Sequence, residues 1–239
     1  MTSIAWIGLG NMGSRMSSHL VTAGHDVRGY DVVDALRDGA AEHGITPVGS
    51  IAEAVEGAEV VILSLPKGEH VRQVLESDGG VFAHAAPGTL ILDTSTVDIE
   101  TSQWCHGQAG SRGFRFVDAP VSGGTQGAQA GTLTFMLGGI EDDVADAKQI
   151  VTPMAGNVFA VGEATHGIAA KLVNNMMLGI SILAMSEGSQ LAQQLGLDPQ
   201  AFFDVARVSS GDSWALRTWY PVPGIVPGAA SNDNFDASF

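Results

Sequence analysis

Lys171 lies in a long apolar stretch, residues 166–185, where a charged side chain is unexpected. An unpaired ammonium buried there would be costly or would lose its proton. If the stretch is a helix, Gly167, Lys171 and Asn175 follow at four-residue steps and share one face. A lysine in a partly dry site suits general acid/base catalysis near neutral pH. We therefore predict that Lys171 transfers a proton and that Asn175 binds substrate; the alternative is a helix lysine whose ammonium reaches water.

A second candidate site is the segment Ser122-Gly123-Gly124, which ends a predicted strand. Successive glycines expose backbone N–H groups, and a serine hydroxyl beside them completes a small pocket for an anion. A substrate carboxylate would suit this pocket. The alternative is a tight turn in which the glycines only supply positive φ angles.

A GxGxxG pattern comes directly after an apolar run and opens a predicted helix, the context in which this pattern indicates a dinucleotide site. Its residues are Gly8, Leu9, Gly10, Asn11, Met12 and Gly13. The glycines permit a tight turn and a close approach of the backbone to a pyrophosphate, which then meets the free N–H groups of the helix N-terminus.

Asp31 ends the second predicted strand, 18 residues after Gly13. A carboxylate there accepts hydrogen bonds from the adenosine ribose hydroxyls and repels a 2′-phosphate. No Arg or Lys occupies positions 32–34. The sequence therefore favours NAD over NADP as the cofactor.

Apolar runs alternate with helical patterns through the first two-thirds of the chain, which predicts an α/β fold with a doubly wound, mostly parallel sheet and helices on both faces. The expected strands lie within 3–10, 25–31, 58–66, 89–96, 114–124, 132–139 and 157–162. The carboxyl ends of parallel strands meet at one edge, so we expect Leu65, Pro66 and Thr96 to line the same cleft as the GxGxxG turn.

The pattern changes after Gly162, where one long helical stretch, residues 166–195, is followed by a second helix near Pro199. We therefore expect a dinucleotide-binding domain over residues 1–163 and an all-helical domain over 164–239. The segment 219–239 is rich in Pro, Gly, Asn and Asp and predicts a long loop with no helix or strand.

The bulk composition excludes several classes of partner. The formal net charge is -15, so nucleic acid is not an expected partner. The single cysteine, Cys105, cannot form an intrachain disulfide, which favours the cytoplasm. The seven histidines show no metal-ligand spacing, so no metal is expected. The N-terminus lacks a signal peptide pattern, and two amides beside Lys171 argue against a membrane span.

Three motifs in this order resemble the β-hydroxyacid dehydrogenase family: the GLGNMG turn, DAPVSGG (118–124) and GIAAKLVNN (167–175). Two further segments, SSGDSW (209–214) and YPVPGIVPG (220–228), resemble its 3-hydroxyisobutyrate dehydrogenase branch. The resemblance covers essentially the whole chain and implies a Rossmann-type NAD(P) domain joined to a helical domain by a long helix. It also implies a homodimer or homotetramer.

The resemblance assigns roles to residues that occupy the family's motif positions. These are Lys171 for catalysis, Asn175, Ser122, Gly123 and Gly124 for the substrate, and Leu65, Pro66 and Thr96 for the cofactor. The implied reaction is the oxidation of 3-hydroxyisobutyrate to methylmalonate semialdehyde in valine degradation. Alternatives are a tartronate semialdehyde or glyoxylate-type reductase, another short β-hydroxyacid dehydrogenase, and a non-catalytic NAD-binding remnant.

Two departures from the family pattern stand out. An asparagine that contacts the cofactor in relatives aligns with His70 here. Relatives also continue beyond the position of Phe239 with a helix that bears a Lys-Asp pair near the cofactor. We therefore expect the helical domain of this chain to be incomplete at its C-terminus.

Overall fold

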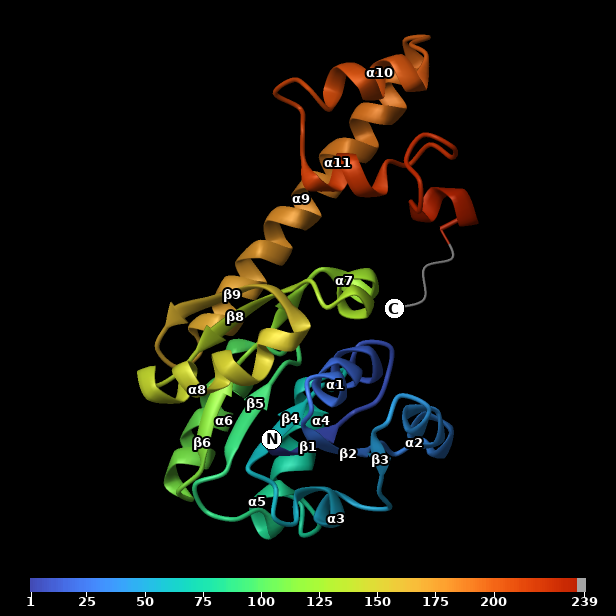
Figure 1. Ribbon diagram of the computed structural model, residues 1–239. Coiled ribbons are helices and arrows are strands. Elements are labelled where there is room, and N and C mark those ends of the chain that lie inside the picture. Colours follow the sequence, from blue (N-terminus) through green and yellow to red (C-terminus); the bar gives the residue numbers. More distant parts are fainter. Residues whose placement is uncertain (236–239) are drawn as a thin grey trace. The chain divides into compact units, whose positions relative to one another are not determined.

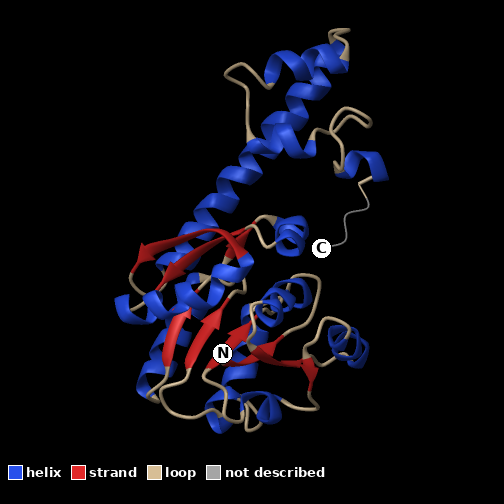
Figure 2. Ribbon diagram, in the orientation of Figure 1, coloured by secondary structure: helices blue, strands red, loops and turns tan. Residues whose placement is uncertain are grey.

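The computed structural model describes residues 1–235 and divides into two compact units, residues 1–171 and the chain from residue 172 onward (Figure 1). The first unit contains all the strands found among the described residues, whereas the second is built from helices and loops (Figure 2). This arrangement confirms the predicted α/β fold followed by a helical region.

Short strands and helices alternate along the first unit. In chain order they are β1 (Ser3–Ile7), α1 (Gly13–Thr22), β2 (Asp26–Tyr30), α2 (Asp34–Ala41), β3 (Thr46–Pro47), α3 (Ile51–Val55), β4 (Val60–Leu63), α4 (Gly68–Glu76), α5 (Val81–His84), β5 (Leu90–Asp93), α6 (Ile99–Ser111), β6 (Arg115–Asp118), β7 (Val121–Ser122), α7 (Gly124–Ala130), β8 (Leu133–Gly138), α8 (Glu141–Val151), η1 (Thr152–Met154) and β9 (Ala155–Gly162).

The strands form one sheet in the order β3-β2-β1-β4-β5-β6-β8-β7, with β9 paired to β8. Strands β1 to β6 are parallel, β8 runs antiparallel to β6 and β7, and β9 is parallel to β8. The chain moves from β1 outward to β3 and then returns to the other side of β1. This reversal between β1 and β4 is the place where an open parallel sheet binds ligands.

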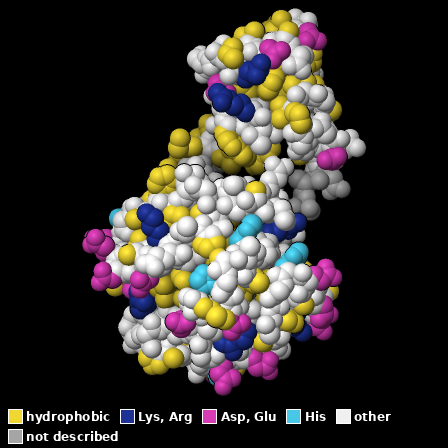
Figure 3. Space-filling model, viewed as in Figure 1, with side chains coloured by type: hydrophobic (Ala, Val, Ile, Leu, Met, Phe, Trp, Pro, Cys, Tyr) yellow, Lys and Arg dark blue, Asp and Glu magenta, His cyan; other side chains and the backbone are white. Residues whose placement is uncertain are grey.

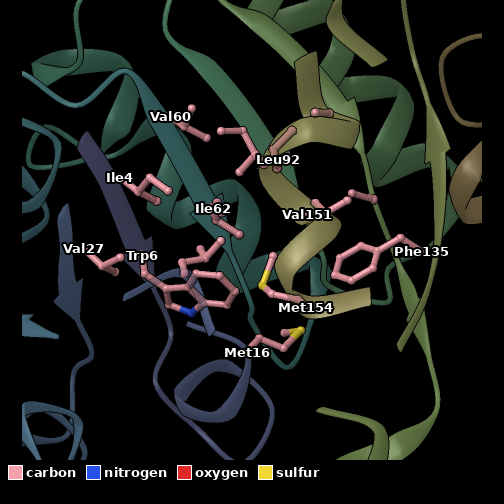
Figure 4. Packing of buried hydrophobic residues seen from close by; sticks show 14 of the residues in the cluster. Ile4, Trp6, Met16, Val27, Val60, Ile62, Leu92, Phe135, Val151 and Met154 are labelled. Atoms are coloured by element: carbon pink, nitrogen blue, oxygen red, sulfur yellow. The ribbon is translucent and has the colours of Figure 1, made fainter. Parts of the chain in front are cut away.

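Both faces of the sheet are buried, as the uninterrupted apolar strands predict. Alternate residues such as Trp6 and Ile62 belong to the core cluster with α1 and α8, where Met16 and Val151 lie close by (Figure 4). The intervening residues, such as Val61, are equally buried. Because side chains alternate along a strand, these residues face the opposite layer.

The helix α9 (His166–Gln194) is continuous across the boundary between the two units. The second unit also contains α10 (Pro199–Ala206), α11 (Trp214–Trp219) and the 3-10 helix η2 (Ala230–Asp233). Its core joins Met185 of α9 to Phe203 and Tyr220, whose ring centroids lie 5.1 Å apart. The prediction of a loop without helix over 219–239 is therefore wrong at η2, while residues 236–239 lie outside the described part.

Helix α9 is long and apolar enough to cross a membrane by length and composition alone. Only 11% of its most apolar window is buried, and its mean hydropathy there is 1.6. Core helices of soluble proteins share this length and composition, so these two features do not by themselves indicate a membrane.

Candidate active site

The register of the parallel strands brings the predicted site segments to one edge of the sheet. Ile7 pairs with Leu63, Leu63 with Asp93, and Asp93 with Asp118. These residues end β1, β4, β5 and β6, so the segments that follow them emerge side by side. The glycine turn, the Leu65 and Thr96 segments and the Ser122 loop all begin at this edge.

Two glycines of the GxGxxG turn are required by the packing of the backbone around them, independently of any ligand. A Cβ at Gly8 would lie 2.2 Å from the carbonyl oxygen of Ser64, and the φ of Gly8 is +100°. A Cβ at Gly13 would lie 1.9 Å from the carbonyl oxygen of Gly8, which also accepts a hydrogen bond from Trp6 Nε1 at 2.9 Å. Neither position can hold a side chain, because backbone atoms occupy the space.

Gly10 differs, because a Cβ built there meets nothing within 4 Å. No internal contact explains a glycine at this position, whereas a close approach of a pyrophosphate to the backbone does. The first turn of α1 contains no acidic residue, and its N-cap Met12 provides no side-chain cap. The residues present therefore fit a dinucleotide, which Gly10 and the amides at the start of α1 would hold.

Leu9 contributes to the shape of this turn. Its side chain is buried, and its N–H donates to Asp31 Oδ2 at 2.8 Å. The other carboxylate oxygen, Oδ1, accepts from Val33 N at 2.9 Å. Asp31 thus fixes the turn to the end of β2, and each of its oxygens retains a lone pair for a ligand hydroxyl.

Arg15 is a feature of the turn that sequence reasoning missed. It lies in the first turn of α1 and lines a hollow of about 440 Å³ with Thr125, Gln126 and Gln129 of α7. A guanidinium beside a predicted pyrophosphate site is electrostatically favourable. The available signal was a basic residue two positions after the last glycine of the pattern.

The segments after β4 and β5 are tied together. Leu65 N donates to Ser95 Oγ at 2.9 Å, while Pro66 and Thr96 are exposed. Leu65 also contacts the glycine turn, since its Cδ2 lies 3.1 Å from the Cβ position of Gly8. The Nδ1 atom of His70 is buried and has no hydrogen-bond partner among the described residues. Its position in α4 is the one where relatives were expected to carry a cofactor-binding asparagine.

The Ser122 loop has the backbone conformation that only glycine adopts easily. Gly123 has a φ of +135° and Gly124 a φ of +62°, and α7 begins directly at Gly124. A Cβ at Gly124 meets nothing within 4 Å, while Ser122 ends the short strand β7 and is half-buried. The first amides of α7 have no partner within the helix, and Ser122 lies only two residues before the first of them.

Lys171 is the last residue of the first unit and is half-buried on α9. Burial lowers the pKa of its ammonium below the ordinary value of a lysine. Asn175 is half-buried one turn further along the same helix, and Asn174 beside it is exposed. The helical prediction for this segment is confirmed, and the spacing places Lys171 and Asn175 on one face of α9.

A buried acidic pair lies behind this edge and was not foreseen from the sequence. Asp93 and Asp118 are 3% exposed each and are paired across β5 and β6. Asp118 Oδ1 accepts a hydrogen bond from His106 Nε2 at 2.7 Å. Burial raises the pKa of Asp93 to about 7, and the charge of Asp118 adds to this increase, while hydrogen bonds from Ser95 oppose it.

Among residues 1–235, no group of three or more His, Cys, Asp or Glu side chains is arranged to hold a metal ion. The single cysteine, Cys105, is buried and free, and burial raises the pKa of its thiol. A buried, protonated thiol is a poor nucleophile.

A glycine-rich turn at the switch point of a parallel sheet is typical of dinucleotide-binding proteins, and comparison with known proteins places this chain among the nicotinamide dinucleotide-dependent oxidoreductases. The family model for the NAD binding domain of 6-phosphogluconate dehydrogenase matches residues 3–162. The model described as NAD-binding of NADP-dependent 3-hydroxyisobutyrate dehydrogenase matches residues 165–239. The chain belongs to the β-hydroxyacid dehydrogenase family, in its 3-hydroxyisobutyrate dehydrogenase branch, as the motifs predicted.

Individual relatives agree with this assignment. The chain is 40% identical over 239 residues to 3-hydroxyisobutyrate dehydrogenase of Pseudomonas aeruginosa, and 38% identical to the NAD-dependent L-serine dehydrogenase of the same organism. It covers 80% of the length of each. A solved structure of Mycobacterium tuberculosis 3-hydroxyisobutyrate dehydrogenase with L-serine is 46% identical, with a TM-score of 0.92; the alignment covers 100% of this chain and 81% of that one.

Replacement of Gly10 by alanine tests the fit of the turn to a dinucleotide. We expect Gly10→Ala to leave the free energy of unfolding unchanged but to raise the Kd for NADH at least about tenfold, because its methyl group enters the space of the pyrophosphate. The matched control is Gly107→Ala on α6, where a Cβ also meets nothing within 4 Å. Equal Kd values for the two variants in fluorescence titrations would contradict the fit.

Replacement of Asp93 by asparagine tests the charge state of the buried carboxyl. Since its folded pKa is raised from 3.8 to about 7, the stability it contributes is complete below about pH 4 and is lost as the pH rises through 7. The unfolding free energy of the wild type minus that of Asp93→Asn should therefore fall between pH 4 and 7, by up to about 1.4 kcal/mol per pH unit. Urea unfolding measures this difference, and Asp38→Asn, at an exposed position, is the matched control.

Proposed function

We propose that this protein oxidises 3-hydroxyisobutyrate to methylmalonate semialdehyde with NAD⁺, a step of valine breakdown, in the cytoplasm. The observation that carries the proposal is the half-buried Lys171 ammonium with its lowered pKa, within a chain of this family. A neutral amine in such a position is a competent base for an alcohol proton.

The residues of the chain have separate tasks in this reaction. The backbone at Gly10 and the N–H groups at the start of α1 hold the pyrophosphate, and Asp31 accepts from the adenosine ribose. Leu65, Pro66 and Thr96 line the cofactor at the ends of β4 and β5. The bound nicotinamide supplies the acceptor for a hydride from the alcohol carbon.

The substrate is held by its carboxylate and its hydroxyl. The Ser122 hydroxyl and the amides of Gly123 and Gly124 accommodate the carboxylate. Lys171 Nζ takes the hydroxyl proton as the C–H bond gives up its hydride, so the alcohol becomes a carbonyl. Asn175 hydrogen-bonds the substrate next to Lys171. In the reverse direction Lys171 returns the proton.

The preference for NAD over NADP rests on Asp31 and its surroundings. A 2′-phosphate would meet the Asp31 carboxylate, which is already committed to Leu9 N and Val33 N and is held in place by them. The nearest cation on α2, Arg37, donates to the carbonyl oxygen of Asp31 and forms an ion pair with Asp34 at 2.5 Å. Arg37 is therefore already engaged by two oxygens of the chain.

L-Serine is a second candidate substrate. The 38% identical relative is named as an NAD-dependent L-serine dehydrogenase, and the solved structure of the 46% identical relative contains L-serine. Serine also carries a carboxylate and a β-hydroxyl, so Ser122 and Lys171 would act on it in the same way. Serine carries an ammonium group where 3-hydroxyisobutyrate carries a methyl group, so the site would have to accommodate this charge.

We also propose a homodimer or homotetramer in solution. Apolar side chains of α9 are exposed on the chain, and hydrophobic surface is visible on the helical unit (Figure 3). They include Val173, Met176, Met177, Ile180 and Leu183, each more than half exposed. A contiguous apolar surface of this kind is a common feature of subunit interfaces.

Replacement of Lys171 tests its role as the base. Lys171→Met should lower kcat by about 10² to 10⁴-fold, whereas Lys148→Met on the exposed face of α8 should leave it unchanged. The kcat of the wild type for alcohol oxidation should rise with pH and level off above the lowered pKa of Lys171, because only the neutral amine accepts a proton. Near-normal turnover by Lys171→Met would disprove the assignment.

A panel of 3-hydroxy acids tests the substrate. The substrates are 3-hydroxyisobutyrate, L-serine and glycerate, which is the alcohol formed by reduction of tartronate semialdehyde. Formation of NADH or NADPH is followed for each substrate with NAD⁺ and with NADP⁺. The proposal predicts the highest kcat/KM with 3-hydroxyisobutyrate and NAD⁺. A higher value with L-serine would favour the second candidate, preference for NADP⁺ would contradict the role of Asp31, and cofactor binding without turnover would identify a non-catalytic protein.

A further inference from the structure

The Asp118 carboxylate binds the beginning of α9 from a distant part of the chain. Its Oδ2 accepts from Ile168 N at 2.7 Å, and its Oδ1 accepts from Thr165 N at 3.0 Å. Ile168 is the third residue of α9 and Thr165 directly precedes the helix, so one amide of the first turn and the amide before it are satisfied by a side chain at the end of β6. A buried negative charge at this place also interacts favourably with the helix dipole.

The first turn of α9 packs directly against the backbone of the sheet. A Cβ at Gly167 would lie 2.4 Å from the carbonyl oxygen of Met136 and 2.7 Å from Asp118 Oδ2. A Cβ at Gly138 would lie 2.5 Å from Gly167 N and 2.8 Å from Asp118 Oδ1. The helix can approach β6 and β8 this closely only because both positions are glycine.

The residue before the helix, Thr165, has a φ of 73°, a conformation that is unfavourable for a β-branched residue. Its N–H donates to Asp118, so the same carboxylate that caps the helix also holds this strained residue. Such a conformation persists only where the surrounding contacts fix it. Asp118 therefore helps to fix the start of α9, together with the close contact at Gly167.

His106 in turn holds Asp118. Its Nε2 lies 2.7 Å from Asp118 Oδ1, its side chain is 14% exposed, and its ring packs edge-to-face on Phe116 at 4.8 Å. Through this contact α6 restricts the rotation of the Asp118 carboxylate. Both oxygens of Asp118 are then directed at their partners, the amides of Thr165 and Ile168, at the start of α9.

Lys171 lies one helical turn after Gly167 and three residues after Ile168. An α-helix transmits a displacement of its first turn rigidly to the next turn. We infer that Asp118 and His106 are positioning residues, which fix the first turn of α9 and thereby place the Lys171 amine for proton transfer. This inference rests on the proposed function, because it concerns the same lysine.

The His106→Leu variant removes the imidazole donor and keeps Asp118. We expect kcat to fall by about 10² with 3-hydroxyisobutyrate, since a misplacement of about 1 Å is sufficient for such a loss. The KM for NAD⁺ should not change, because the glycine turn is attached elsewhere. The pH at which kcat rises should move upward as the lysine becomes more hydrated, which a loss of active protein alone would not cause. His106→Gln, whose Nε2 can replace the imidazole donor, should restore most of the rate.

The matched control is His84→Leu, since His84 Nε2, at the end of α5, also makes one hydrogen bond, to the carbonyl oxygen of Asp78 at 3.0 Å, in an exposed position. This variant should keep both the rate and the pH profile. Hydrogen exchange, which needs no substrate, should be faster over residues 167–171 in His106→Leu and unchanged in β1.

The outcomes separate the two hypotheses. Suppose that Lys171→Met loses activity. If His106→Leu then keeps the wild-type pH profile, or keeps the wild-type hydrogen exchange at residues 167–171, the inference is overturned and the proposed function remains intact. Normal activity of Lys171→Met would overturn the proposed function. Faster exchange at 167–171 in His106→Leu would then still demonstrate the anchoring of α9, but the placement of a catalytic amine would be disproved.

Discussion

One buried carboxylate constrains the arrangement of the first unit more than any other group. Asp118 carries a charge that is nearly excluded from water, so it requires hydrogen-bond donors to offset the cost of burial. Those donors come from α6 and from the beginning of α9, which are distant in sequence. They meet only when β6 has joined the sheet. Completion of the sheet and placement of the lysine-bearing helix are therefore linked by one electrostatic requirement.

The glycines of the chain separate the demands of folding from those of ligand binding. At Gly8, Gly13 and Gly167 a Cβ would collide with backbone atoms, so these positions are required by the fold itself. At Gly10 and Gly124 the same atom would enter open space, although at Gly124 the φ of +62° also favours glycine. The first group brings strands and helices into contact, and the second leaves backbone amides accessible. Together they describe a rigid edge with accessible hydrogen-bond donors, which is suited to an anionic cofactor and an anionic substrate.

The long elements and the family could be predicted from the sequence, because they depend on local patterns. The buried strands β1, β4 and β5 are continuous apolar runs, and the glycine turn is contiguous. The short elements β3, α3, α5 and α7 were not predicted, since a few residues carry no measurable periodicity. Neither was the pairing of His106 with Asp118, which arises only when α6 packs against β6. Arg15 differs, since its place two residues after the last glycine was a local signal and only its neighbours on α7 come from a remote segment.

The proposed reaction depends on the Lys171 amine, which burial makes easier to deprotonate. The chain has three lysines, Lys67, Lys148 and Lys171, so a protein labelled with ¹³C in the lysine side chains gives few signals to assign. The most direct measurement is an NMR titration of these signals, with Lys171→Arg to identify the one of interest. The account predicts that the signal missing from that variant titrates below the ordinary lysine value. Titration of that signal at or above the ordinary value would show a fully hydrated ammonium and would contradict the central claim.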